Sequence, residues 1–567
     1  IFGILLTFTT VAPIIAIVED TIKIHPGTLD AFLSNKVNGY SLVNYVDLFT
    51  SEYSVSNLWI PLNNTFWLAV FSCLFAIVYG GGFAFLVTRT NLKFKKYLSS
   101  IFIFPYIMPS WSIAMFWQNF FKNTSVASAP GIGLLQSITM AMGINGGQGI
   151  MAPAWLVGGF FPTAIVMGIH YAPFAYILIG GILRNMDANL EEAATILHAS
   201  RWKIIRRITL PIVAPAMIST VLLVFASSVS SYTVPQFLAG SNPLYFISLT
   251  MRSALTTGKK GEGYVIATIL MIFSIIILSI NNSFTKSRRS FTTVSGKSGQ
   301  ISKINMRGAK WVVAIIICVL VTFFAIVPLV TFILESLEET PGVFSTISLK
   351  YWISQEETID DVFLLSRDLS TKGIFFNHTI LNSFGRSIIV AVIVALICGT
   401  CGILIGYAVS KNRRGKLANY VNSMAFLPYL MPSVAVGAAY FILFSSGKIN
   451  LFNTYIALII VGVVKYIPFS SRSALNSMLQ LSNEIEESAI ILNIPWIKRM
   501  TRIIIPIQKS SIVSGFLLPF MTCLRELSLF MLLCVQGFIL STTLDYFDEM
   551  GLYAFSSGIN LLLIVTI

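Results

Sequence analysis

Long apolar runs alternate with shorter polar segments along almost the whole chain. A helix needs about 20 apolar residues to cross the hydrocarbon core of a bilayer, and twelve runs approach or exceed that length. We expect these spans at 1–18, 66–88, 98–120, 154–183, 211–234, 264–280, 311–334, 384–410, 421–444, 451–471, 511–536 and 551–567. The pattern predicts an all-α polytopic membrane protein. The chain lacks an initiator Met and stops within a span, so we expect it to continue beyond both ends.

Sequence repeats divide the spans into two sets of six. Tyr171-Ala-Pro-Phe174 recurs 295 residues later as Tyr466-Ile-Pro-Phe469, and Pro-Tyr-x-Met-Pro-Ser occurs at 105–110 and at 428–433. Because six is an even number, the second set enters the membrane from the same side as the first, and the repeats are parallel. We expect three units, a first repeat at 1–285, a linker at 286–310 and a second repeat at 311–567.

Basic and acidic residues occupy alternate polar segments. The basic residues gather at 89–96, 184–207, 286–310, 411–416 and 498–509. Acidic residues prevail in 19–65 and 335–383. Since basic loops are typically cytoplasmic, we expect a bacterial cytoplasmic membrane protein whose basic loops lie in the cytosol. This placement accounts for the net charge of +14 through the lipid bilayer, without a nucleic-acid partner.

The most extensive repeat is a polar loop after the fourth span of each half, at 187–210 and 482–505. Its first copy contains Glu191, Glu192, Ala193, Ala194, Leu197 and His198, and its second contains Glu486, Glu487, Ser488, Ala489, Leu492 and Asn493. Carboxylates suit the first turn of a helix, and the spacing places the apolar and small residues on one face. Each copy therefore predicts a short docking helix, with Asp187 or Ser482 as its N-cap. An ordinary amphipathic loop helix would not explain the repeated spacing.

This loop closely resembles the EAA motif of binding-protein-dependent ABC importer permeases. The family pattern is Glu-Ala-Ala, three residues, Gly, nine residues and Ile-x-Leu-Pro. The chain matches it from Glu192 to Pro211 and from Glu487 to Pro506, with His198 and Asn493 at the glycine position. His and Asn are enriched among non-glycine residues with positive φ, so we expect the turn to persist at both places.

The resemblance implies the type I ABC importer permease fold and a set of partners. Two copies of a cytosolic ATPase are expected to grip the two docking loops, and an external binding protein is expected to reach the segments 19–65 and 335–383. ATP and Mg²⁺ would be used by the ATPase, and this chain would bind no cofactor. Gly296-Lys297-Ser298 is the tail of a P-loop, but Phe291 stands where the first glycine is needed. We therefore expect no enzymatic activity.

Polar and ionisable residues inside predicted spans are candidates for a substrate pathway, because such residues are costly in apolar surroundings. Seven candidates are aligned by the repeat or adjoin aligned residues, namely His170, Ser230, Ser231, Tyr232, Lys465, Arg525 and Glu526. Arg525 and Glu526 are neighbours, and on a helix they would point about 100° apart. An interhelical ion pair is the alternative for this pair. For His170 and Lys465, packing and snorkelling are equally good interpretations.

The substrate is indicated only by a weaker resemblance. The run Arg-Glu-Leu-Ser at 525–528 and the single-chain double permease with acidic external loops resemble ferric-iron importers. Related double permeases serve thiamine, phosphonates and polyamines. Fe³⁺ prefers oxygen ligands, which Glu526 and Tyr232 would supply, with Arg525 holding an accompanying anion. An ion-coupled secondary transporter is the rival from another class, but it would not explain the duplicated loop.

Overall fold

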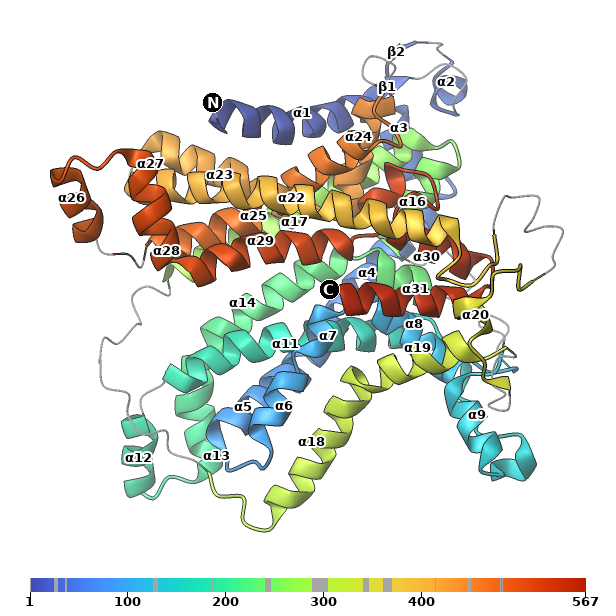
Figure 1. Ribbon diagram of the computed structural model, residues 1–567, viewed down its shortest axis with the longest axis horizontal. Coiled ribbons are helices and arrows are strands. Elements are labelled where there is room, and N and C mark those ends of the chain that lie inside the picture. The colour runs from blue at the N-terminus through green and yellow to red at the C-terminus, as the bar shows by residue number, and fades with distance from the viewer. Residues whose placement is uncertain are drawn as a thin grey trace.

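The computed structural model describes the chain except residues 1, 25–28, 36–37, 126–130, 186–187, 240–245, 288–303, 340–345, 360–369, 413–414, 446–449, 480 and 482. Most of the long helices run between two ends of the molecule (Figure 1). One end, here called the docking end, carries α12 (Ala188–Ile196) and α26 (Asn483–Ile491). The opposite end carries α9 (Leu134–Ala141) and α20 (Lys350–Ile353). The one described sheet is a pair of short strands, β1 (Lys23–Ile24) and β2 (Gly39–Tyr40).

Each half contains a corresponding set of long helices. The first half has α1 (Phe2–Ile22), α4 (Ile60–Ala76), α5 (Gly82–Arg89), α6 (Lys95–Ile101), α7 (Phe104–Ile107), α8 (Ser110–Phe121), α11 (Phe160–Asn185), α14 (Leu210–Val229) and α17 (Lys260–Ser287). The second half has α18 (Ala309–Ala325), α19 (Val327–Leu337), α22 (His378–Lys411), α23 (Lys416–Leu430), α24 (Ser433–Ser445), α25 (Tyr455–Met478), α29 (Lys509–Leu524) and α31 (Tyr553–Thr566).

Shorter helices connect these elements. They are α2 (Leu29–Ser34), α3 (Val43–Thr50), α10 (Ala154–Val157), α13 (Arg201–Ile204), α15 (Thr233–Leu238), α16 (Ile247–Thr256), α27 (Trp496–Arg499), α28 (Ile505–Ile507) and α30 (Leu540–Glu549). Within the described residues, six helices are long and apolar enough to cross a membrane, or up to 11 if each bent pair is one span. A shorter apolar helix, α31, corresponds to the last predicted span. The predicted all-α polytopic class is confirmed, although several spans are broken rather than straight.

The two spans that carry Pro-Tyr-x-Met-Pro-Ser show the sharpest breaks. The first bends by 98° between α7 and α8, and the second bends by 101° between α23 and α24. A residue that precedes proline is driven out of the helical region. Met108 and Met431 accordingly have ψ values of 146° and 139°. The straight spans predicted at 98–120 and 421–444 were therefore wrong in shape, because the second proline of each motif ends one helix and starts another.

Three helices form the centre of each half. In the first half α4, α11 and α14 pack on one another, and in the second half α22, α25 and α29 do the same. Small residues allow this close approach: a Cβ on Gly402 of α22 would lie 2.5 Å from the Cβ of Ser470 on α25. The repeated order of packing agrees with the sequence repeat.

The first span of each half packs against the other half. Helix α1 contacts α23 and α24, whereas α18 contacts α6 and α7 (Figure 1). The unit boundaries at 285 and 311 stay a prediction, and most of the linker lies outside the described residues. The exchange of first spans means that each half is completed by a helix of its partner half.

Candidate functional site

A cavity of about 280 Å³ lies between the two halves. Its walls come from α8, α11 and the end of α14 in the first half, and from α24, α25 and the end of α29 in the second. All seven residues predicted for the substrate pathway line it: His170, Ser230, Ser231, Tyr232, Lys465, Arg525 and Glu526. The structure thus brings them together, while their role in transport stays a prediction.

Arg525 and Glu526 do not lie within a helix, contrary to the span predicted at 511–536. Helix α29 ends at Leu524, and Arg525 is its C-cap. In the same way α14 ends at Val229, so the span predicted to reach 234 is also too long. Irregular backbone inside a span is tolerated where it lines a cavity, and polar side chains occupy both breaks here. Because neither residue is helical, their side chains do not follow the 100° separation expected of neighbours on a helix.

The Arg525 guanidinium reaches from the second half to the broken span of the first half. Its Nη1 donates to the carbonyl oxygens of Tyr106, at 2.8 Å, and Ile107, at 3.3 Å. Trp111 Nε1 donates to the carbonyl of Arg525 at 3.3 Å. No acidic side chain of the described residues forms an ion pair with Arg525. The alternative of an interhelical ion pair is therefore not realised in this structure.

The Glu526 carboxylate is held within the second half. Its Oε2 accepts from the hydroxyl of Tyr466 at 2.7 Å, and its Oε1 accepts from the backbone N–H of Leu529 at 3.0 Å. Its backbone carbonyl accepts from Ser541 Oγ at 2.8 Å. These contacts fix the carboxylate beside α25, on the wall of the cavity.

His170 and Lys465 occupy equivalent positions and make equivalent contacts. His170 Nδ1 donates to the carbonyl of Pro105 at 3.0 Å. Lys465 Nζ donates to the carbonyls of Pro428, at 3.2 Å, and Met431, at 2.5 Å. Each side chain thus donates to carbonyls at the helix break, and the Pro428 carbonyl also accepts from the Met431 N–H at 3.3 Å. These contacts favour the packing interpretation for His170, and they show that Lys465 does not snorkel away from the cavity.

Tyr232 and Glu526 were predicted as candidate metal ligands. The Tyr232 hydroxyl donates to Gln236 Oε1 at 2.8 Å and accepts from Arg252 Nη1. Both oxygens of Glu526 accept from protein donors as well. Within the described residues there is no group of three His, Cys, Asp or Glu side chains that could hold a metal ion. The metal hypothesis stays untested, and it would need these hydrogen bonds to open.

The two docking loops end their helices with the same turn. His198 and Asn493 have φ values of 55° and 54°, so the predicted left-handed turn is confirmed at both glycine positions. Ala199 N–H donates to the carbonyl of Ala194 at 3.0 Å, and Ile494 N–H donates to that of Ala489 at 3.1 Å. This is the hydrogen-bond pattern of a Schellman motif, formed twice.

One glutamate of each docking helix, Glu191 or the aligned Glu486, binds the membrane domain behind it. Glu191 Oε1 accepts from Thr209 Oγ1 at 2.8 Å, and Arg89 Nη1 lies 3.4 Å from its Oε2. Glu486 accepts from Tyr407 and Lys411. Burial opposes ionisation of Glu486, but the hydrogen bonds from Lys411 and Tyr407 hold its pKa below the ordinary value. Sequence reasoning placed these glutamates in the docking loop but did not find their partners.

The far side of each docking helix is exposed and partly apolar. Leu197 is 81% exposed and Leu492 is 73% exposed. Glu487 and Ser488 are also exposed, Ala194 is half-buried and Ala489 is buried. The side chain of Glu192 and the candidate N-caps 187 and 482 lie outside the described residues. The predicted apolar face therefore points mainly away from the membrane domain rather than into it.

The model for binding-protein-dependent transport system inner membrane components matches the chain twice, at residues 66–287 and 399–567. The chain belongs to this family. The two matched regions fall in the two halves that carry the docking helices, so this permease contains the family's domain twice.

Two curated relatives are similar over most of this permease. The ferric transport system permease protein FbpB of Actinobacillus pleuropneumoniae is 23% identical over 480 residues, which are 82% of this chain and 63% of that protein. The putative ferric transport system permease protein FbpB 1 of Haemophilus influenzae is 24% identical over 516 residues, which are 88% and 74%. This chain thus spans less than two thirds of the first relative.

One solved structure shares a more distant likeness. It is a bacterial ABC transporter involved in the import of the acidic polysaccharide alginate, with a TM-score of 0.36 and 18% sequence identity. The match covers 51% of this chain and 93% of that chain. Such a score is too low to compare helix positions.

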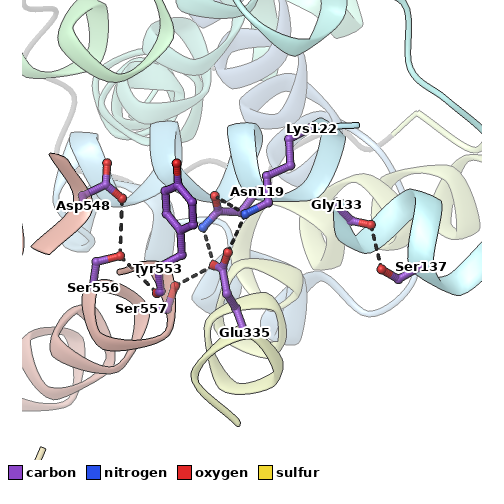
Figure 2. Close-up of polar contacts among 9 residues, drawn as sticks. All are labelled: Asn119, Lys122, Gly133, Ser137, Glu335, Asp548, Tyr553, Ser556 and Ser557. Atoms are coloured by element: carbon purple, nitrogen blue, oxygen red, sulfur yellow. Dashed lines mark hydrogen bonds and ion pairs between the residues drawn. The ribbon is translucent and has the colours of Figure 1, made fainter. Parts of the chain in front are cut away.

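A buried polar cluster joins the two halves of the permease beyond the cavity (Figure 2). Glu335 on α19 accepts from Lys122 Nζ at 2.7 Å, from Ser557 Oγ at 2.6 Å and from Asn119 Nδ2. Lys122 Nζ also lies 4.5 Å from the centre of the Tyr553 ring. Sequence reasoning missed this cluster, although Lys122 is the one charged residue in 121–153. An isolated lysine in an uncharged segment was the available signal.

Asp548 lies beside this cluster and accepts from Ser556 Oγ at 3.3 Å (Figure 2). Burial raises the pKa of Asp548 to about 7, the charge of Glu335 adds to the shift, and Lys122 opposes it. The cluster therefore contains a carboxyl group that changes charge near neutral pH.

Proposed function

We propose that this permease forms the translocation pathway of an ATP-driven importer whose substrate is delivered by an extracytoplasmic binding protein. The observation that carries the proposal is the pair of equivalent docking helices at one end of the molecule (Figure 1). Both end in the same turn, and both anchor an aligned glutamate, Glu191 or Glu486, to the membrane domain. Two equal, partly apolar surfaces fit two copies of one cytosolic ATPase.

In each half the docking helix is joined to the cavity by one segment of the chain. Helix α14 begins at Leu210, where the first docking loop ends, and finishes at Val229 beside the cavity. Helix α29 runs in the same way from Lys509 to Leu524. Movement imposed on α12 or α26 would therefore reach the cavity wall through one bent connection in each half, with bends of 55° and 82°. ATP and Mg²⁺ act in the partner ATPase, and closure of its two copies moves the halves relative to each other.

The orientation follows from charge. The docking end carries basic segments at 184–207 and 498–509, and such loops are typically cytoplasmic. We assign the opposite end to the side where a binding protein delivers substrate. The names of the two curated relatives support ferric iron as that substrate. Thiamine, phosphonate and polyamine importers remain the alternatives within the same class.

The proposal is tested by co-expressing the permease with a candidate ABC ATPase subunit and purifying the complex in lipid nanodiscs. Changing Leu197 and Leu492 together to Glu should abolish ATPase retention, because a charge at each apolar contact costs several kcal/mol when buried. Met142→Glu is the control, since Met142 is 69% exposed near α9 at the opposite end. The double change Glu192→Lys and Glu487→Lys should uncouple ATP hydrolysis from uptake while membrane insertion is retained.

Uptake that persists in proteoliposomes lacking any ATPase would contradict the proposal. It would favour the ion-coupled secondary transporter instead. A complex that retains the ATPase equally well in the Leu197→Glu and Leu492→Glu double variant would also contradict the assigned docking surfaces.

A further inference from the structure

The charged groups of the cavity do not suit a bare metal cation. Arg525 and Lys465 are the cationic residues of its lining, and Glu526 is its one acidic residue. Both oxygens of that carboxylate already accept from protein donors, the Tyr466 hydroxyl and the Leu529 N–H. A trivalent cation entering this space would meet two positive side chains and a single carboxylate that already accepts two hydrogen bonds.

The helices that pack around the cavity also carry basic rather than acidic side chains. Helices α11, α14, α25 and α29 together carry four charged side chains, Arg184, Lys465, Arg472 and Lys509, and all are basic. The positive-inside rule explains Arg184 and Lys509, which lie at helix ends nearest the docking loops. It does not explain Lys465, which is buried at the cavity, or Arg472, which lies seven residues further along the same face of α25.

Arg525 is the cation of the cavity with unused donors. A guanidinium has five N–H groups in a planar fork that matches carboxylate and phosphate oxygens. Nη1 of Arg525 donates to the carbonyls of Tyr106 and Ile107, while Nε and Nη2 have no partner among the described contacts and are not sealed from the cavity. Lys465, by contrast, has two of its three donors committed to carbonyls.

Neutral donors complete a lining suited to an oxyanion. The cavity is lined by hydroxyl-bearing side chains from both halves, including Tyr106, Tyr429, Ser433 and Ser528. Hydroxyl groups donate to carboxylate and phosphate oxygens without adding charge. An oxyanion held by Arg525 would therefore find further hydroxyl donors on the cavity walls of both halves.

We propose that the substrate crosses this cavity as an oxyanion, a carboxylate or phosphate group that is either free or the ligand of a metal ion, and that Arg525 binds it. The inference rests on the proposed function, because it concerns what passes through the pathway. It is compatible with ferric iron, provided that the iron travels with its anionic ligand.

The test is direct binding to the purified permease–ATPase complex in nanodiscs, measured by equilibrium dialysis. The probes are inorganic phosphate, citrate, ferric citrate and the uncharged complex of ferric ion with three acetohydroxamates. Arg525→Gln should weaken binding of each bound oxyanion probe by about tenfold or more, the loss expected for charge-assisted hydrogen bonds. Arg386→Gln is the matched control, because Arg386 stacks on Phe538 outside the cavity. It should change binding less than about twofold.

A second variant separates binding from folding, because Arg525 also caps two carbonyls. Arg525→Lys keeps the charge and a donor but loses the fork, so it should retain the fold and bind oxyanions less tightly than the native complex. Retention of the ATPase and basal ATP hydrolysis report on assembly. If the native chain does not assemble with the ATPase, the proposed function is contradicted. If assembly succeeds and no oxyanion probe binds, only the proposal of an oxyanion substrate is contradicted.

The pattern of probes identifies the source of the oxyanion. Binding of phosphate or citrate alone supports a free anionic substrate, and binding of ferric citrate alone supports a metal carried with its ligand. Binding of the uncharged ferric complex with equal affinity in the native and Arg525→Gln complexes would overturn the proposal.

Discussion

The two halves of this permease share a fold but differ in charge where they meet. The first half presents His170, Ser230 and Ser231 to the cavity, and the second presents Lys465, Arg525 and Glu526 at the aligned positions. The docking helices have not diverged in this way, since both keep the same turn and the same anchored glutamate. One chain that contains both halves can change one side of its pathway alone, while two equal partners would keep its docking surfaces alike.

The broken spans show how this asymmetry is held together. In the second half, carbonyls freed by the break are capped by Lys465 from the same half. In the first half they are capped by His170 and, across the interface, by Arg525. The second half thus supplies cationic donors to both breaks, and the first half depends on it.

The largest effect is expected from Lys465→Met. This change removes both hydrogen bonds of Lys465 and leaves the Met431 carbonyl without its donor, while the Pro428 carbonyl keeps the Met431 N–H; we expect a loss of about 2–4 kcal/mol of stability. His170→Met removes one hydrogen bond and should cost about half as much. Thermal unfolding of the two variants in the same detergent compares the halves directly. Equal losses of stability in the two variants would show that His170 and Lys465 stabilise the two breaks equally. The difference in charge between the two side chains would then not affect stability.

The fold and the docking loops could be predicted because they depend on local patterns. Apolar runs and a repeated Glu-rich loop are visible along the chain itself. The ends of α14 and α29 were misplaced, because polar residues such as Ser230 and Arg525 can continue a helix or end it, and the deciding factor is the cavity beside them. The partners of Arg525 lie more than 400 residues away at Tyr106 and Ile107, so no spacing rule reveals them.

A smaller effect is expected from pH at the polar cluster that joins the halves at Lys122 and Glu335. The raised pKa of Asp548, about 7, means that the fold favours its protonated form. The cost of ionising Asp548 is absent below its ordinary pKa, grows as the pH rises toward 7 and is complete above it. We expect about 2–3 kcal/mol less stability at pH 8 than at pH 5.

Asp548→Asn should flatten that dependence, as measured by thermal unfolding at the two pH values. Asp545 is the neighbouring group whose pKa burial also raises to about 7, so Asp545→Asn is the matched comparison and the double variant should be flatter still. An Asp548→Asn variant with an unchanged pH dependence would assign the effect to other groups.

A still smaller difference is expected between the two anchored glutamates. Glu486 contacts Tyr407 and Lys411 and lies 3.9 Å from Arg499, whereas Glu191 contacts Thr209 and Arg89. Glu486→Gln should lower the free energy of unfolding by about 1–2 kcal/mol and Glu191→Gln by about 1 kcal/mol, as measured by thermal unfolding. Both variants should also lose coupled ATP hydrolysis. Because the pKa of Glu486 is lowered in the fold, its contribution is present above the ordinary pKa and is lost as the pH falls through the folded value. Equal losses of stability in the two variants at neutral pH would contradict this predicted difference between the halves.

The smallest effect is expected where the halves agree best, at the turns that end the docking helices. His198 and Asn493 both adopt positive φ, which glycine reaches without steric strain and which Asn tolerates better than His. Glycine at either position relieves strain in the folded chain but gives the unfolded chain more freedom. We therefore expect His198→Gly to stabilise by about 0.5–1 kcal/mol and Asn493→Gly to be nearly neutral, as thermal unfolding would show.

Ala at both positions is the control, and it should destabilise both turns by about 1 kcal/mol. A larger gain at Asn493 than at His198 would mean that contacts of the two side chains, rather than backbone conformation, set the stability of these turns.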